Sequence, residues 1–232
     1  MIFRQLFDTD SSTLTYLLAD GQGIAVIIDP VLEHVETYLS LLDSLKLALR
    51  WVLDTHIHAD HITGARAIKE RTGATTAIAG NCEATGYDRQ LADGEMLAFG
   101  NESIRIIATP GHTSESLCYL WRDRLFTGDT LMIGACGRTD FQNGSSTEMY
   151  HSITQKLFVL PEETLVYPCH DYKGRRVSCI GEEKVLNARI AGKTLDEFVR
   201  IMDNLNLAPP KRIHEAVPAN LLGGGSPEAR QN

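Results

Sequence analysis

The sequence predicts an α/β protein in which two β-sheets are covered by helices. Apolar runs rich in β-branched residues mark several strands near the N-terminus, and a Gly- and Asp-containing turn around residues 20–23 indicates that the first ones pair antiparallel. Segments with apolar residues at helical spacing then occur between further strands. This order of strands, helix, strands and helices, without an internal repeat, is typical of two sheets flanked by helices.

The predicted elements cover most of the chain. Strands are predicted at 3–7, 12–18, 24–28, 49–55, TTAIA, EMLAF, SIRIIAT, LCYLWR, RLFTGD and TLVYP. Helices are predicted at 35–45, 62–71, 147–158, 182–190 and 195–205. We expect one catalytic domain over residues 1–219, followed by a flexible Gly-rich tail over 220–232.

Composition narrows the classes of function. The chain has 232 residues, 43% of them hydrophobic, which suits an ordinary globular core. Its formal charge of -8 disfavours nucleic acid as a partner. The start, MIFRQLFDTDSS, has no leader pattern, and no run of apolar residues reaches transmembrane length. The five cysteines form no CxxC pair. We therefore expect a soluble cytoplasmic protein without a membrane partner.

The segment THIHADH, residues 55–61, carries four side chains suited to metal coordination: His56, His58, Asp60 and His61. It lies between a predicted buried strand and a predicted helix, so these side chains can converge from a loop that is held at both ends. The alternative is a polar loop in which Asp60 caps the helix. Capping needs only one such residue, whereas four are present.

Three more candidate ligands follow in turn-rich segments: His112 in TPGHT, Asp129 in FTGDT and His170 in YPCHD. Imidazoles and carboxylates suit zinc and iron(II), and without paired thiolates a closed structural zinc site is disfavoured. The pattern therefore predicts an open, catalytic metal site.

These four motifs, in this order, resemble the metallo-β-lactamase superfamily. The stretches GACGRTDFQNGSS, PCHDYKG, FVRIMDNLNL and AVPAN are similar to the persulfide dioxygenases, also called sulfur dioxygenases, within it. The resemblance covers nearly the whole chain and implies the αβ/βα sandwich of two mixed sheets flanked by helices. Because the superfamily includes β-lactamases, thioester hydrolases and nucleases, the fold alone does not determine the reaction.

The resemblance implies one Fe(II) per chain, bound by His56, His112 and Asp129 with other positions open. It also implies glutathione persulfide and O₂ as substrates, converted with water to glutathione and sulfite during hydrogen sulfide oxidation. A sulfurtransferase (rhodanese) that acts upstream is a further expected partner. A homodimer is the expected assembly of the chain.

Four candidates have two interpretations. In dinuclear relatives, His58 completes the shell of the first metal, and Asp60, His61 and His170 help to hold a second. With a single iron, all four would orient ligands, water or substrate through hydrogen bonds.

The substrate-binding candidates also have alternatives. Arg138 would pair with a glutathione carboxylate or with Asp140. Tyr172 would donate its hydroxyl to the peptide part of glutathione or pack half-buried, and Lys173 would add positive charge. Thr113 would contact substrate or satisfy a backbone group.

Two other functions remain open from sequence. Glyoxalase II, a dinuclear thioester hydrolase, shares THxHxDH and a glutathione-bearing substrate, S-lactoylglutathione, and would use a metal-bound hydroxide as the nucleophile. Against it, the stretch after His170 resembles the dioxygenases rather than the longer helical extension of that hydrolase. A non-catalytic scaffold is disfavoured because all seven ligand positions are present.

Overall fold

The computed structural model describes residues 1–225, which divide into two compact units. Unit 1 contains Met1–Leu91, Leu97–Ser103 and the residues from Pro209 onward; unit 2 contains Ala92–Met96 and Ile104–Ala208. The expectation of one catalytic domain over residues 1–219 stays a prediction. None of the helices in the described part of the chain has the length and apolar character needed to cross a membrane.

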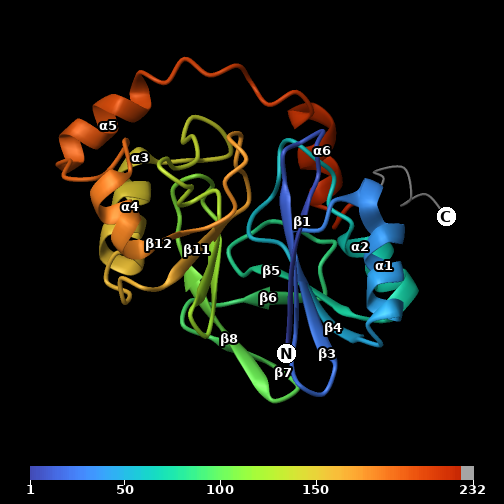
Figure 1. Cartoon of the computed structure of the whole chain (residues 1–232). Helices are drawn as coiled ribbons and strands as arrows, with labels where there is room; N and C mark the ends of the chain where they lie inside the picture. Colours follow the sequence, from blue (N-terminus) through green and yellow to red (C-terminus); the bar gives the residue numbers. More distant parts are fainter. Residues whose placement is uncertain (226–232) are drawn as a thin grey trace. The chain divides into compact units, whose positions relative to one another are not determined.

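Unit 1 is built on a mixed six-stranded sheet (Figure 1). In order across the sheet its strands are β1 (Ile2–Phe7), β2 (Leu14–Ala19), β3 (Ile24–Ile28), β4 (Ala48–Leu53), β5 (Thr75–Ala79) and β6 (Arg89–Leu91). The predicted antiparallel beginning is confirmed, since β1, β2 and β3 pair antiparallel. From β3 onward the pairing is parallel, which directs the ends of β3 and β4 to the same edge of the sheet.

Two helices pack on one face of this sheet, α1 (Val35–Ser44) after the 3₁₀ turn η1 (Leu32–His34), and α2 (Ala65–Thr72). Their apolar residues, among them Tyr38 and Ile68, form one buried cluster with β2, β3 and β4. Both helices agree with the predicted ones to within three residues. Because α2 begins only at Ala65, the whole THIHADH segment lies in the loop between β4 and α2.

The second six-stranded sheet has the order β12 (Ser178–Cys179), β11 (Leu165–Pro168), β10 (Arg124–Gly128), β9 (Leu117–Trp121), β8 (Glu102–Ala108) and β7 (Met96–Phe99). It is also mixed: β8, β9 and β10 pair antiparallel, whereas β10 and β11 pair parallel. Residues 97–103, at the β7–β8 turn, count with unit 1. Sequence patterns missed the short strands β6 and β12.

Helices of unit 2 cover one face of that sheet and share a buried cluster with it. They are α3 (Ser146–His151), continued by the π-helical turn η2 (Ser152–Leu157), α4 (Ile180–Leu186) and α5 (Leu195–Asp203). The α5 helix begins with a capping box, in which Thr194 and Glu197 satisfy each other's backbone N–H groups. The predicted helices at 147–158 and 195–205 correspond to α3 with η2 and to α5, whereas the helix predicted at 182–190 overlaps α4 but ends at Leu186.

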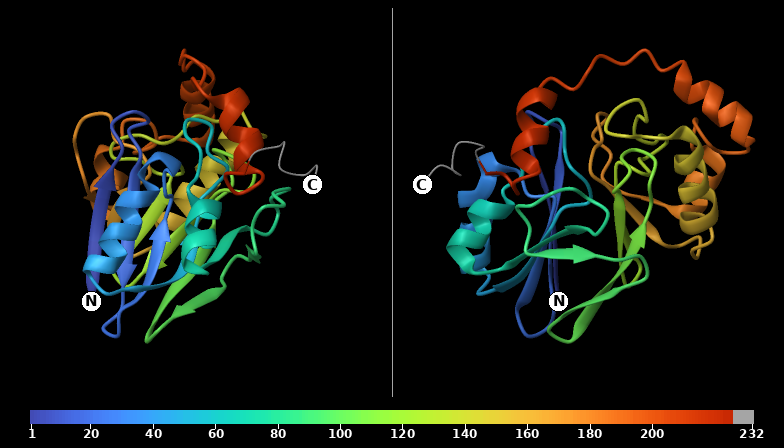
Figure 2. Two further views of the ribbon diagram at one scale, coloured as in Figure 1. Left: turned by 90° about the vertical axis from the view of Figure 1, so that its right-hand side faces the viewer. Right: turned by 180° about the vertical axis from the view of Figure 1, so that it is seen from behind.

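After α5 the chain returns to unit 1 and forms α6 (Ile213–Asn220), which sequence patterns did not predict because Pro218 interrupts the helical pattern. Figure 2 shows α6 in two further views. Residues 220–225 fall in the tail predicted to be flexible, yet Leu221 and Gly223 accept backbone hydrogen bonds from Thr85 and Arg66, both of 2.9 Å. Residues 226–232 of that tail lie outside the described residues.

Candidate metal centre

Four of the predicted ligands belong to unit 1 and three to unit 2. In unit 1 the loop after β4 buries His56, His58 and His61, each exposed by 2% or less. The ring of His58 lies 4.2 Å from the ring of His56 and 4.3 Å from that of His61, measured between centroids. Ligand atoms of His58, Asp60 and His61 lie within 4.8 Å of one another, close enough to share a metal ion. The loop therefore brings the four predicted side chains together.

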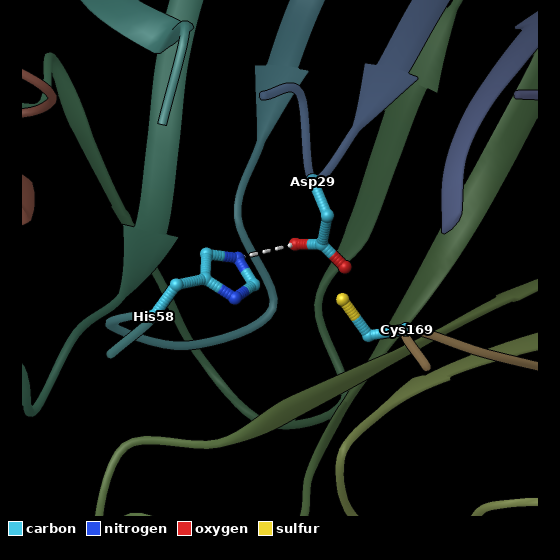
Figure 3. A group of neighbouring side chains, drawn as sticks. All are labelled: Asp29, His58 and Cys169. Atoms are coloured by element: carbon cyan, nitrogen blue, oxygen red, sulfur yellow. Dashed lines mark hydrogen bonds and ion pairs between the residues drawn. The ribbon is translucent and has the colours of Figure 1, made fainter. Parts of the chain in front are cut away.

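Asp29, at the end of β3, organises this loop (Figure 3). The His58 Nε2–H donates to Asp29 Oδ1 over 3.1 Å, and the Thr55 backbone N–H donates to the same oxygen over 2.7 Å. The Thr55 hydroxyl also donates to the carboxylate, with Oγ1 3.0 Å from Oδ2. Since that hydroxyl has one hydrogen, its oxygen accepts from His56 Nδ1, 3.0 Å away. Asp29 thus orients both histidines.

These hydrogen bonds determine which ring nitrogens carry lone pairs. A proton on Nδ1 of His56 leaves the lone pair on Nε2, and a proton on Nε2 of His58 leaves it on Nδ1. Nδ1 of His58 is buried and has no hydrogen-bond partner among residues 1–225. A buried lone pair without a donor is costly, and a metal cation would satisfy it. The loop therefore fits a metal.

Carboxylates control the charge of the loop in the metal-free chain. Burial opposes a charged His58, but Asp29 and its hydrogen bond, with Asp54 and Asp60, raise the pKa of His58 to about 9. Burial raises the pKa of Asp54 to about 6, although Tyr87 and Thr63 donate to it. The loop attracts positive charge, so a metal ion would bind in competition with a proton.

The remaining ligand candidates of this loop are hydrogen-bonded to each other. His61 Nδ1 lies 3.1 Å from Asp60 Oδ2 and 3.2 Å from the hydroxyl oxygen of Thr13. Asp60 is partly exposed, whereas His61 is buried. A carboxylate that is hydrogen-bonded to one ring nitrogen of a histidine increases the basicity of the other nitrogen, which favours metal binding at that second nitrogen.

In unit 2 the structure brings His112, Asp129 and His170 together. His112 Nδ1 donates to the backbone carbonyl of Arg138 over 2.7 Å, which leaves the lone pair on Nε2, 3.5 Å from Asp129 Oδ2. His170 Nε2 lies 3.8 Å from the other oxygen, Oδ1. That oxygen is buried and accepts no hydrogen bond from the described part of the chain. A metal ion would compensate this buried carboxylate oxygen.

A glycine makes this arrangement possible. The Gly137 N–H donates to the Asp129 carbonyl over 2.7 Å. A Cβ at position 137 would lie 2.4 Å from that carbonyl oxygen and 2.8 Å from His112 Nδ1. Any side chain here would displace both predicted ligands, which explains glycine in the GACGRTD segment.

Helix α4 and its C-cap residue bind the backbone of the GACGRTD segment. Glu183 and Asn187 are buried; Glu183 accepts from the Gly134 N–H over 2.8 Å, and Asn187 donates to the Ala135 carbonyl over 2.9 Å. Burial raises the pKa of the nearby Cys136 thiol to about 11, so this cysteine stays protonated rather than reactive.

The substrate-binding candidates differ in what their side chains already contact. Arg138 donates twice to Asp140, over 2.6 and 2.7 Å, and also to the carbonyls of Leu207 and Ala208. The ion pair with Asp140, one of the two alternatives, is thus present. Thr113 is fully buried, and its hydroxyl lies 2.8 Å from that of Ser116.

Tyr172 and Lys173 are exposed, unlike Thr113. Tyr172 is 73% exposed, and its ring stacks on that of His170 with centroids 5.9 Å apart. Of the two alternatives for Tyr172, a half-buried packing role does not fit this exposure. Its hydroxyl can reach a ligand from solvent.

Sequence reasoning missed three residues that support the loop of unit 1: Asp29, Asp54 and Asn220. Asp29 has a left-handed backbone, with φ of 51°, and stands in the IIDP turn directly after a buried strand, where it reads as an ordinary turn residue. No local pattern could have connected Asn220 to this loop.

Comparison with known proteins identifies the family. A family model described as the metallo-beta-lactamase superfamily matches residues 8–81 and 78–170. The human mitochondrial persulfide dioxygenase ETHE1 is 41% identical over 227 residues, which cover 97% of this chain and 89% of that protein. This chain belongs to the persulfide dioxygenase family of the metallo-β-lactamase superfamily.

The crystal structure of ETHE1 from Myxococcus xanthus is 53% identical in sequence, with a TM-score of 0.95, and the match covers 97% of this chain and 100% of that one. Membership confirms the metallo-β-lactamase αβ/βα fold class predicted from the motifs. A more distant relative, Glyoxylase B2 of Dictyostelium discoideum, is 28% identical and covers 97% of this chain and 91% of that protein. The persulfide dioxygenase family, with the clusters of His and Asp in each unit, makes the protein a metal-binding enzyme.

Proposed function

We propose that the protein oxidises glutathione persulfide with O₂ and water to glutathione and sulfite at a single Fe(II). The observation that carries the proposal is the similarity to persulfide dioxygenases, 40–53% identical over 97% of this chain. The reaction balances: one persulfide, one O₂ and one water yield one thiol, one sulfite and two protons. The terminal sulfur is oxidised and O₂ is reduced.

His56, His112 and Asp129 are the proposed iron ligands. When bound, Fe(II) supplies electrons to O₂ and an open position for the substrate sulfur. The protein fixes each ligand in the form that a metal needs. The Thr55 hydroxyl orients His56, the Arg138 carbonyl orients His112, and the hydrogen bond to each Nδ1 places the lone pair on Nε2.

His58, Asp60, His61 and His170 are proposed to support this single metal rather than bind a second. His58 shares Asp29 with the hydrogen-bond chain that orients His56, so it can stabilise the ligand without binding iron. The alternative is that these residues bind a second metal ion, since the ligand atoms of His58, Asp60 and His61 lie close together. The number of metal ions per chain separates the two hypotheses.

For substrate binding, Tyr172 and Lys173 are the favoured candidates because both are exposed. Arg138 uses four of its five N–H groups on Asp140 and two carbonyls, so two-point pairing with a glutathione carboxylate would have to replace Asp140. Arg138→Ala tests this directly. A raised KM with unchanged kcat supports substrate binding, and a lowered melting temperature with unchanged KM assigns Arg138 to structure.

We further propose a cytoplasmic location, a homodimer, and an upstream sulfurtransferase of the rhodanese type that supplies the sulfane sulfur. Fractionation, sedimentation and a coupled assay with thiosulfate test these three points.

Iron retention in two variants tests the proposed ligand set. Asp129→Ala should abolish iron retention, because it removes a ligand, whereas His61→Ala should leave much of the iron bound. Equal loss in both variants would count against the single-iron hypothesis. Hydrolysis of S-lactoylglutathione without O₂ consumption would instead support the glyoxalase II alternative, and a protein without stoichiometric metal would support the scaffold alternative.

A further inference from the structure

Asn220, the last residue of α6, is fully buried and directs its amide at one place, the predicted metal loop of unit 1. Its Nδ2 donates to the carbonyl oxygens of His58 and His61, both over 2.9 Å. Its Oδ1 accepts from the Thr63 backbone N–H, also over 2.9 Å. One side chain therefore satisfies three buried backbone groups of a single loop.

Helix α6 is itself held against this loop. Val217 and Leu221 pack against a buried cluster that includes Ile57, the residue between the first two histidines of the loop. The N–H groups of Thr85 and Gly86 donate to the Leu221 carbonyl over 2.9 and 3.2 Å. The position of Asn220 is thus fixed independently of its own hydrogen bonds.

The three bonds restrain the loop backbone where it carries ligands. They tie the carbonyls of His58 and His61, three residues apart, to one amide group, which limits how far the two rings can separate. His58 also binds Asp29, which orients His56 through Thr55. A displacement of His58 would therefore reach the His56 ring through three hydrogen bonds, from His58 to Asp29, from Asp29 to Thr55 and from Thr55 to His56.

We propose that Asn220 is a positioning residue for the metal: by holding the backbone of residues 58–63, it keeps the histidines of the loop in the geometry that binds iron. The proposal rests on the proposed assignment of this loop to the metal. Asn220 lies 162 residues after His58, so the loop lacks this restraint until the C-terminal helix has docked.

The test compares Asn220→Asp with the wild-type holoenzyme. The carboxylate keeps the acceptor for Thr63 but replaces both amide donors with an oxygen that repels the His58 and His61 carbonyls. Release of Fe(II) to a competing chelator, measured well below both melting temperatures, should become about tenfold faster. Hydrogen exchange of the amides of residues 57–63 in the metal-free protein should rise. If Asn220→Asp does not fold, Asn220→Ser, which adds no charge, is compared with the wild type instead.

Asn204→Asp is the matched control, because the Asn204 amide also donates to a backbone carbonyl, that of Arg200, but at the end of α5 in unit 2. It should leave both readouts unchanged. Wild-type rates of iron release and of loop exchange in both Asn220 variants would overturn the proposal, as would equal changes in the control. A wild-type protein that holds no iron would refute the proposed function, and faster exchange confined to the Asn220 variants would still support the loop restraint.

Discussion

Asp29→Asn is the sharpest test of how the loop of unit 1 is organised. Asparagine matches aspartate in size and tolerates the left-handed backbone at this position, φ 51°, so the substitution removes charge without adding backbone strain. The carboxylate accepts from Thr55 N–H, Thr55 Oγ1–H and His58 Nε2–H; the substitution removes its charge and replaces one of its two acceptor oxygens with an NH₂ donor, so these three donors can no longer all be satisfied. Loss of a carboxylate behind metal-binding histidines typically weakens metal binding about 10- to 100-fold, or about 1.4–2.8 kcal/mol.

The assay is an anaerobic titration of metal-free protein with Fe(II) against a competing chelator. Asp20→Asn is the matched control: Asp20 is also a buried carboxylate that accepts backbone N–H groups, but it lies at the opposite end of β3. We expect the Kd for iron to rise only in Asp29→Asn. A Kd within twofold of wild type would refute the role assigned to Asp29.

Three further predictions follow from individual contacts. Gly137→Ala should accelerate iron loss, because its methyl would lie 2.4 Å from the Asp129 carbonyl oxygen; iron content after dialysis checks this, and full retention would contradict it. Tyr172→Phe keeps the ring that stacks on His170 but loses the exposed hydroxyl, so KM for glutathione persulfide should rise about 2- to 10-fold at constant kcat in steady-state assays; an unchanged KM would remove Tyr172 from substrate binding. Burial raises the pKa of Asp8, but hydrogen bonds from Ser11 and His34 outweigh it and lower that pKa to about 2. Because this folded-state pKa lies below the ordinary 3.8, the stabilisation is present above about pH 4 and lost as the pH falls towards 2. Asp8→Asn should therefore lower the free energy of unfolding by about 2 kcal/mol near pH 7 and by much less near pH 2 in urea titrations; an equal effect at both would contradict this origin.

Local patterns predicted the ligand segments because the ligands occur close together in sequence. His56, His58, Asp60 and His61 stand within seven residues, and an apolar strand before them shows where the loop begins. Most strands and helices were predicted for the same reason, since their apolar period is visible within a few residues.

The supporting residues could not be predicted because their partners are distant in sequence. Asp29 is 29 residues from His58, and Asn220 is 162 residues from it. Each looks like a common turn or helix-end residue until the fold brings it to the loop. The sequence could not separate the two possible roles of Arg138 either. Asp140, two residues away, and a substrate carboxylate offer the guanidinium the same kind of acceptor.

The most direct measurement of the central claim is sulfite formation from glutathione persulfide by one iron-loaded sample, followed first without air and then in oxygenated buffer with O₂ uptake recorded. The proposed function predicts no sulfite without O₂ and one O₂ consumed per sulfite once oxygen is admitted. Equal turnover in both conditions, or full activity with two zinc ions per chain, would contradict it.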